Sequence, residues 1–145
     1  MKVNIKKLDE NAVIPQYAHV GDAGMDVVAT SVCRTNDYIE YGTGLAFEVP
    51  EGYVMLIFPR SSNSKKDLLL ANAVGVLDST YRGELKLRFK QIVPVVLSGE
   101  PRKEYAVGDK VGQIMIIPYP TVEFNEVDEL SETQRGAGGF GSTGK

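Results

Sequence analysis

The sequence predicts an all-β chain, arranged as a jelly-roll-like barrel or sandwich with one short helix. Short apolar runs recur along the chain, and several of them alternate with polar residues, which is typical of strands. Turn-forming residues separate the runs, as at Pro50–Gly52, Ser98–Pro101 and Pro118–Pro120. A chain of 145 residues suits one domain. Many short strands with regular turns between them indicate a sandwich, a jelly roll or a barrel.

The first predicted strand covers residues 1–8, where Val3 and Ile5 alternate with lysines. Runs rich in β-branched and aromatic residues predict the later strands. A short helix is predicted around residues 62–69, directly after Pro59. The other predicted strands cover residues 44–49, 53–58, 85–89, 92–97, 110–117 and 122–127.

The stretch Asn72–Leu85 predicts a β-hairpin whose turn carries an acid and an aromatic ring. A short apolar strand runs into Asp78, Tyr81 and Gly83 follow, and a new strand then begins. Ordinary turn chemistry also explains this composition, because Asp and Ser favour turns and Tyr packs well on sheets. Taken alone, the stretch therefore leaves a functional and a structural interpretation open.

A flexible glycine-rich tail is predicted over residues 131–145, after a β domain over 1–130. Beyond Ser131 only Phe140 is strongly apolar, and five of the last eleven residues are glycine. Such a segment cannot bury a core, but it can become ordered on a ligand. Its backbone N–H groups suit a polyphosphate and its aromatic ring suits a flat base. The segment matches most of a Walker A loop, but no strand is predicted to lead into it.

Composition excludes several classes of partner. The formal net charge of −3 argues against DNA or RNA, since phosphate backbones favour basic patches. No apolar run approaches the roughly 18–20 residues of a membrane span, and the first residues lack the apolar core of a signal peptide. We therefore expect no membrane partner and a cytoplasmic location, or a nuclear or host-cytoplasmic one depending on the source. Cys33 cannot form an internal disulfide, and with His19 alone it cannot build a zinc site.

Five stretches, in order, resemble the five motifs of the trimeric dUTPase family. The resemblance implies a jelly-roll subunit, a homotrimer with shared active sites, and Mg²⁺. It also implies hydrolysis of dUTP to dUMP and pyrophosphate, which limits uracil in DNA and supplies dUMP for thymidylate synthesis. The stretches are Ala23–Val27, Pro59–Ser62, Asn72–Leu85, Gly108–Gln113 and Arg135–Gly144.

By this resemblance Asp78 is the catalytic aspartate, which accepts a proton from the water that attacks the α-phosphorus. A positioned general base contributes about 10²–10⁴-fold, and an ordinary carboxylate suffices when its geometry is good. Gln113 would hydrogen-bond the phosphate or the water. Asp26, in the first motif, would organise the site or its metal-bound water rather than take part in the chemistry.

The resemblance also implies residues that bind the substrate. Arg60 and Ser61 would bind phosphate oxygens, and Ser62 stands where many family members have glycine. Backbone groups of the third motif would pair with the uracil edge, and Tyr81 would lie against C2′ of the sugar. In the tail, Phe140 would stack on uracil. The complete set of expected substrate-binding residues is Arg60, Ser61, Ser62, Asn72, Gly75, Val76, Leu77, Tyr81, Lys86, Arg135, Phe140, Gly141, Ser142 and Thr143.

No residue is expected to bind the metal directly, because Mg²⁺ commonly keeps its waters and binds substrate phosphates. Two alternatives to dUTP hydrolysis stay open at this stage. A dCTP deaminase shares the fold, but its family needs a glutamate ten residues after the hairpin aspartate, where this chain has Arg88. A nucleotide-sensing module without catalysis is the second alternative, although Asp78, Gln113, Tyr81 and Phe140 are all present.

Overall fold

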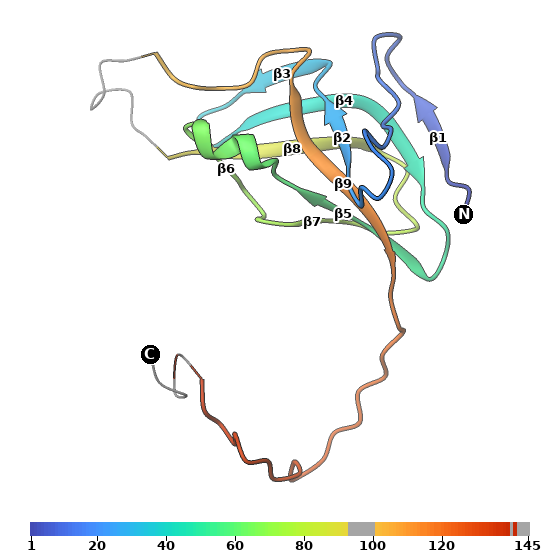
Figure 1. The fold of residues 1–145 in the computed structure, drawn as a ribbon, viewed down its shortest axis with the longest axis vertical. Coiled ribbons are helices and arrows are strands. Elements are labelled where there is room, and N and C mark those ends of the chain that lie inside the picture. The colour runs from blue at the N-terminus through green and yellow to red at the C-terminus, as the bar shows by residue number, and fades with distance from the viewer. Residues whose placement is uncertain (93–100, 140, 142–145) are drawn as a thin grey trace.

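Two antiparallel sheets form the fold in a computed structural model that describes residues 1–92, 101–139 and 141 (Figure 1). The first sheet has the strand order β1-β4-β8-β6, with β3 also paired to β4. The second sheet has the order β2-β9-β5-β7. The strands are β1 (Asn4–Lys7), β2 (Met25–Val28), β3 (Ser31–Arg34), β4 (Ile39–Glu48), β5 (Tyr53–Phe58), β6 (Leu68–Leu70), β7 (Gly75–Leu77), β8 (Glu84–Gln91) and β9 (Lys110–Pro118).

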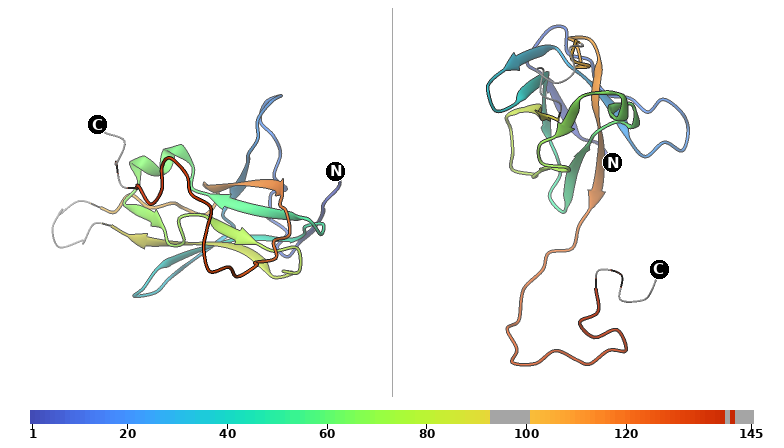
Figure 2. Two further views of the ribbon diagram at one scale, coloured as in Figure 1. Left: turned by 90° about the horizontal axis from the view of Figure 1, so that it is seen from below. Right: turned by 90° about the vertical axis from the view of Figure 1, so that its left-hand side faces the viewer.

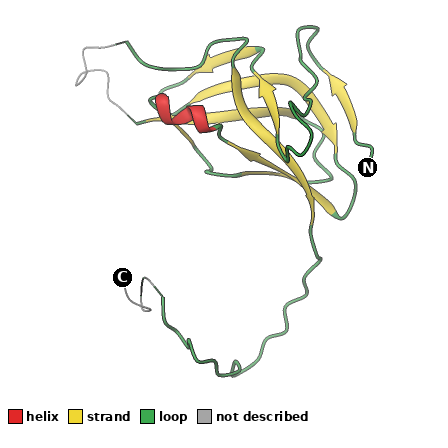
Figure 3. Cartoon of the chain, viewed as in Figure 1, coloured by secondary structure: helices red, strands yellow, loops and turns green. Residues whose placement is uncertain are grey.

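The all-β jelly-roll prediction is confirmed, and the apolar core lies between the two sheets. Alternation along β8 turns Leu85, Leu87 and Phe89 inward, while the residues between them face outward. The Tyr41 ring packs edge-on against Phe89, at 5.7 Å between ring centres, and against Tyr105 at 5.8 Å. Figure 3 shows how little of the described chain is helical. No helix among these residues is long and apolar enough to cross a membrane.

The predicted helix is shorter than expected. Only Ser61–Lys65 is helical, as the 3₁₀ turn η1, and Leu68–Leu70 instead forms β6 beside β8. Leu68 and Leu70 face the core with Leu69 exposed, which is the period of a strand. The polar run Ser61–Lys65 has no buried residue to anchor a longer helix.

The prediction of a strand over residues 122–127 is wrong. These residues form no strand and are exposed, with the Phe124 side chain 94% exposed. Pro118 and Pro120 lack the backbone N–H groups needed to continue the ladder from β9, and none of the described strands pairs with residues 122–127. The predicted strand over 92–97 falls outside the described residues except at Ile92. This residue is exposed and belongs to no strand.

The expected hairpin in Asn72–Leu85 does not form as a pair of strands. β7 pairs with β5 in the second sheet, whereas β8 pairs with β4 and β6 in the first. The connection from Asp78 to Gly83 is too long to be a tight two-residue hairpin turn, and it carries the chain from one sheet to the other. After β9 the chain leaves the sandwich and runs away from it, as the views in Figure 2 show.

Candidate functional site

β7 and β8 do not pair with each other, and this leaves an open seam between Gly75–Leu77 and Glu84–Leu87. β7 uses one edge to pair with β5, and β6 covers β8 only from Phe89 to Gln91. No described strand pairs with the two edges that face the seam, so backbone groups there are available to a ligand, apart from the Glu84 and Leu85 carbonyls, which accept from Tyr81 and Thr43. The seam closes where the Ala71 N–H donates to the Arg88 carbonyl at 2.9 Å.

A cavity of about 480 Å³ lies at this seam. Its size suits a small organic ligand, and its wall mixes apolar side chains with a few charged ones. Predicted site residues from one motif meet here, and Glu40 joins them from β4. The lining consists of Glu40, Ile57, Leu70, Ala71, Asn72, Gly75, Val76, Leu77, Asp78, Tyr81, Glu84, Leu85, Lys86, Leu87 and Arg88.

Asp78 and Tyr81 stand at the mouth of the cavity on the loop between the sheets. The Tyr81 N–H donates to the Asp78 carbonyl at 3.1 Å, and the Tyr81 hydroxyl donates to the Glu84 carbonyl at 3.2 Å. The ring passes so close to Gly83 that a Cβ atom there would collide with the Tyr81 hydroxyl. Glycine at this position therefore lets the tyrosine lie flat along the loop.

Asn72 begins the turn that leads into β7, and this turn contains a backbone outlier. Ala73 has a φ of 58°, in the left-handed region that alanine seldom adopts. The Ala73 N–H donates to the Leu70 carbonyl at 3.0 Å, which fixes this conformation. A Cβ atom on Gly75 would lie 3.3 Å from the Asn72 amide nitrogen and 3.0 Å from Ile57. The absence of a side chain at Gly75 thus keeps this end of the seam clear.

Two cations and one carboxylate form a charged wall of the cavity. Lys86 Nζ lies 2.9 Å from Glu40 Oε1, and Arg88 Nε lies 2.7 Å from Glu40 Oε2. The hydrogen bond from Lys86, together with that from Arg88, holds the pKa of Glu40 below its ordinary value despite its burial. Sequence reasoning missed Glu40, because its pairing with β8 depends on the register between distant strands.

A second polar cluster joins the predicted residues of three other motifs. Asp26 on β2 lies opposite Gln113 on β9, and Gln113 lies opposite Phe58 at the end of β5. Arg60 follows β5 directly and contacts Asp26 with Nε–Oδ1 at 2.7 Å. Gln113 Nε2 donates to the Pro59 carbonyl at 3.2 Å. Strand register therefore brings together residues that are far apart in the sequence.

Asp26 is held between two cations. Its second oxygen lies 2.9 Å from Nζ of Lys110, a residue that sequence reasoning did not single out although it lies within the fourth motif. Burial by itself would raise the pKa of Asp26, but hydrogen bonds and charges from Lys110 and Arg60 outweigh it and hold the pKa below its ordinary value. Asp26 therefore acts here as an ionised anchor for Arg60, not as an acid.

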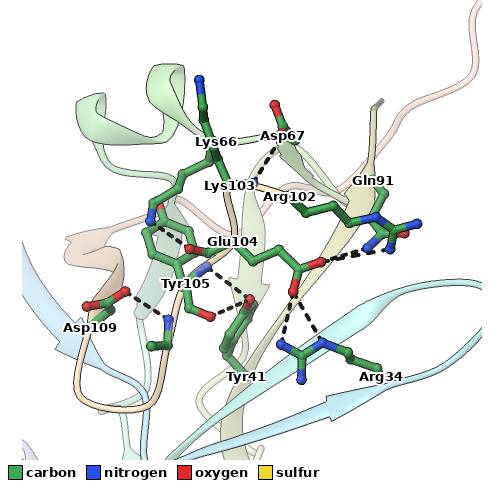
Figure 4. A network of polar contacts seen from close by, with 11 residues as sticks. Arg34, Tyr41, Lys66, Asp67, Gln91, Arg102, Lys103, Glu104, Tyr105 and Asp109 are labelled. Carbon is green, nitrogen blue, oxygen red and sulfur yellow. Dashed lines mark hydrogen bonds and ion pairs between the residues drawn. The ribbon is translucent and has the colours of Figure 1, made fainter. Parts of the chain in front are cut away.

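A buried aromatic group supports the turn that carries Arg60, Ser61 and Ser62. The Tyr105 hydroxyl donates to Asn63 Oδ1 in η1 at 3.1 Å, and Asn63 Nδ2 donates to the Leu68 carbonyl at 2.9 Å. The backbone of Tyr105 is held in turn by the Tyr41 hydroxyl, as Figure 4 shows. Arg60 Nη1 donates to Ser62 Oγ at 3.2 Å, so Ser62 helps to orient the guanidinium.

The structure does not bring all predicted residues to one place in a single chain. The seam cavity lies at the β7 edge of the second sheet, whereas the Asp26–Arg60–Gln113 cluster lies at its β2–β9–β5 end. The seam cavity is lined by none of Asp26, Arg60 and Gln113, whereas a separate cavity is lined by Asp26 and Gln113. In the tail, Arg135 is exposed and its Nε donates to the Gly138 carbonyl at 2.9 Å, and Gly141 has a φ of 89°. Phe140, Ser142 and Thr143 lie outside the described residues.

Residues 10–144 match the family model described as dUTPase. A deoxyuridine 5'-triphosphate nucleotidohydrolase of Nautilia profundicola is 40% identical over 148 residues, which cover 100% of each protein. Its counterpart in Hydrogenobaculum sp. is 41% identical over 150 residues, with 99% of each covered.

Solved structures are similar over nearly the whole fold. A variant of the Staphylococcus bacteriophage 80alpha dUTPase with dUpNHpp has a TM-score of 0.82 at 29% identity, with 99% of each chain covered. A variant of the dUTPase from phage phi11 of S. aureus has a TM-score of 0.71 at 29% identity and covers 89% of this chain and 98% of its own. That structure reveals the coordination of a structural Mg(II) ion.

Proposed function

Because the chain belongs to the dUTPase family, we infer that it hydrolyses dUTP to dUMP and pyrophosphate. The observation that carries this inference is the open seam with Asp78 at its mouth. A similar fold binds dUpNHpp, an analogue of the substrate, in the phage 80alpha enzyme. The reaction therefore belongs to the class of nucleoside triphosphate pyrophosphohydrolases.

The uracil ring occupies the seam in this proposal. Unpaired backbone edges of Gly75–Leu77 and Glu84–Leu87 offer fixed donors and acceptors to the edge of a base. Cytosine places an amino group where uracil has a carbonyl, so one buried polar contact would be mismatched at a cost of about 1–3 kcal/mol. Asn72 lies at the same end of the cavity and adds a side-chain amide.

Asp78 accepts the proton of the attacking water, and Tyr81 excludes ribonucleotides. Both side chains lie at the mouth of the cavity, where the sugar and α-phosphate of a bound nucleotide would leave the seam. The Asp78 side chain is exposed, so it can approach a water molecule aligned with the phosphorus. A ribose 2′-hydroxyl would meet the Tyr81 ring, which Gly83 allows to lie close to the loop.

Both cations of the seam wall, Lys86 and Arg88, are paired with Glu40, so the triphosphate needs further cations. We assign this role to the Arg60 cluster of a neighbouring subunit. Gln113 lies opposite Phe58, the last residue of β5 before Arg60 and Ser61, whereas Asp78 follows Leu77, which lies opposite Met55. One chain therefore carries two halves of a site that a homotrimer would join. Arg60 is preorganised by Asp26 and Ser62, so its remaining donors face phosphate oxygens.

The outer face of the second sheet supports the trimer. Alternation along β5 and β9 leaves half-buried apolar side chains facing away from the core. A continuous apolar surface of this kind is typical of an interface between subunits. The exposed Val122, Phe124 and Val127 offer further apolar surface to a neighbour. The outward residues are Val54, Leu56 and Phe58 on β5, and Met115 and Ile117 on β9.

Mg²⁺ is the cofactor in this proposal, held mainly by substrate phosphates and waters. The described residues contain no group of three or more His, Cys, Asp and Glu side chains that could bind a metal. A donor set of phosphate oxygens and water suits this ion, which would neutralise charge on the triphosphate. The protein residues align the phosphate chain, exclude water and accept the proton.

The tail over residues 131–145 closes over the bound nucleotide in this proposal, as the lid of a β domain over 1–130. Its glycines provide backbone N–H groups, Arg135 provides a cation, and Phe140 provides a ring for the base. Closure would exclude water and hold the triphosphate in a reactive pose.

Product analysis tests the function directly. The purified protein with Mg²⁺ is incubated with dUTP or dCTP, and pyrophosphate, dUMP and ammonia are measured. We expect pyrophosphate and dUMP from dUTP in equal amounts. Ammonia released from dCTP would instead identify a deaminase, and tight binding of dUTP without any product would identify a nucleotide sensor.

A further inference from the structure

Arg88 lies in the wall of the seam cavity, although none of the steps above uses it. It stands at the closed end of the seam, because its carbonyl accepts the last hydrogen bond before the β8 edge becomes unpaired. Because Arg88 also lines the cavity, a base that reaches the closed end of the seam would lie beside this residue.

Two contacts fix the Arg88 side chain. Its Nε donates to Glu40 at 2.7 Å, and its guanidinium carbon lies 4.4 Å from the centre of the Tyr38 ring. The Glu40 side chain is only 13% exposed. Within residues 1–92 and the other described parts of the chain, no hydrogen bond occupies the terminal Nη atoms of Arg88. The guanidinium is thus held in place with donors still available.

Arg88 and Lys86 give this wall of the cavity hydrogen-bond donors. A guanidinium and an ammonium carry donors only. The two Glu40 oxygens are already engaged, one by Lys86 and one by Arg88. A carbonyl at position 4 of the base, as in uracil, can accept a hydrogen bond from these donors. An amino group at this position, as in cytosine, is itself a donor and cannot.

We propose that Arg88 is a specificity-determining residue, whose guanidinium donates to the 4-carbonyl of the base and favours deoxyuridine over deoxycytidine nucleotides. This inference rests on the proposed function, which places the base in the seam. It adds a charged side chain to the backbone recognition described above. Glu40 and Tyr38 act as positioning residues behind it.

A simpler role for Arg88 would be general attraction of the anionic triphosphate. That role would favour uracil and cytosine nucleotides equally, because their phosphates are the same. Lys90 offers a matched control for it. It is an exposed cation two residues further along β8, on the same face of the strand, and it does not line the cavity.

The test compares binding of dUpNHpp with binding of the corresponding deoxycytidine imidotriphosphate, by calorimetry with Mg²⁺. Arg88→Met keeps an unbranched apolar stem and loses the charge and the donors, Arg88→Lys keeps the charge, and Lys90→Met is the control. We expect Arg88→Met to weaken dUpNHpp binding about tenfold or more, with less than about a twofold change for the cytosine analogue. Arg88→Lys should lose part of this discrimination, and Lys90→Met should change both affinities by the same factor.

Equal weakening of both analogues by Arg88→Met would overturn the proposal in favour of simple charge attraction. Unchanged affinity for both would overturn it too, because the guanidinium would then make no contact with the base. Thermal unfolding is measured for each variant. If Arg88→Met does not fold, Arg88→Lys decides, and unchanged discrimination in that variant refutes the role. Pyrophosphate release by the unaltered protein is a separate measurement, so a failure of the proposed function is recognised independently.

Discussion

At the scale of single residues, the environment of Asp78 suits a base that acts on water. Its side chain is exposed at the cavity mouth, and no hydrogen bond from the described residues reaches its carboxylate. Asp26 is the opposite case, since both of its oxygens are occupied by cations. We therefore propose different tasks for the two aspartates, a chemical one for Asp78 in the third motif and a structural one for Asp26 in the first.

Asp78→Asn is expected to retain dUpNHpp binding and to lower kcat for dUTP by at least about 100-fold. The amide keeps the size of the side chain but cannot accept the proton from water. Steady-state pyrophosphate release and calorimetric binding measure the two effects. Asp37→Asn, at an exposed turn outside the cavity lining, serves as the control. Near-normal turnover in Asp78→Asn would show that the base is another group.

Tyr81→Ala is expected to hydrolyse UTP, because the ring no longer blocks the 2′-hydroxyl. The ratio of UTP to dUTP turnover should rise about tenfold or more. Tyr81→Phe is the matched control and should preserve discrimination. Gly83→Ala should resemble Tyr81→Ala in part, since its new methyl group collides with the tyrosine. Turnover of both nucleotides is measured for each variant, and an unchanged ratio in Tyr81→Ala would remove Tyr81 from sugar selection.

At the scale of elements, Asp26 ties β2 to β9 and to the turn after β5. Its lowered pKa means that its ion pairs stabilise the fold fully above its ordinary pKa of 3.8. This contribution is lost as the pH falls through the lowered pKa. We expect the melting temperature of the unaltered protein to fall more steeply below about pH 4 than that of Asp26→Asn. Parallel curves in calorimetry would contradict the assigned role of the ion pairs.

Elements with a strong local signal were predictable from sequence. The strand over 53–58 has the predicted bounds, because its apolar run lies between Gly52 and Pro59. β1, β8 and β9 also lie where alternation indicates them. The short strands β2 and β3 were missed, as was the first half of β4, where glycines at 42 and 44 interrupt the apolar pattern.

The sequence does not predict which strands pair with each other or which side chains form contacts. The sequence around Asp78 indicates two strands and a turn, but it does not show that β7 joins the second sheet and β8 the first. The site residues came from motif resemblance, whereas the contacts of Lys110 with Asp26 and of Arg88 with Glu40 depend on strand register. The segment 122–127, where a strand was expected, pairs with none of the described strands.

At the scale of the whole molecule, the proposed trimer joins the two halves of the site from neighbouring subunits. Met115→Lys places a charge on the apolar outer face of β9 and is expected to yield a folded monomer with at least about 100-fold lower dUTP turnover. Light scattering gives the mass, and circular dichroism checks the fold. Leu69→Lys, on β6 of the first sheet, is the control and should remain trimeric and active. An active Met115→Lys monomer would refute the shared site.

Truncation after Gln134 removes the lid and should lower kcat/KM for dUTP at least about tenfold, because water is no longer excluded from the reacting phosphate. The melting temperature should change little, since the exposed Arg135 and its described neighbours contribute nothing to the core. Full activity of the truncated protein would remove the tail from the mechanism.

The open seam also has an evolutionary consequence. Where a base is read by main-chain atoms, substitutions of outward side chains such as Val76 leave the recognition groups in place, because every residue except proline offers the same N–H and C=O. Sequence drift along β7 is thus tolerated without loss of fidelity. Proline, which removes a donor, and insertions, which shift the register, are the changes that selection has to remove.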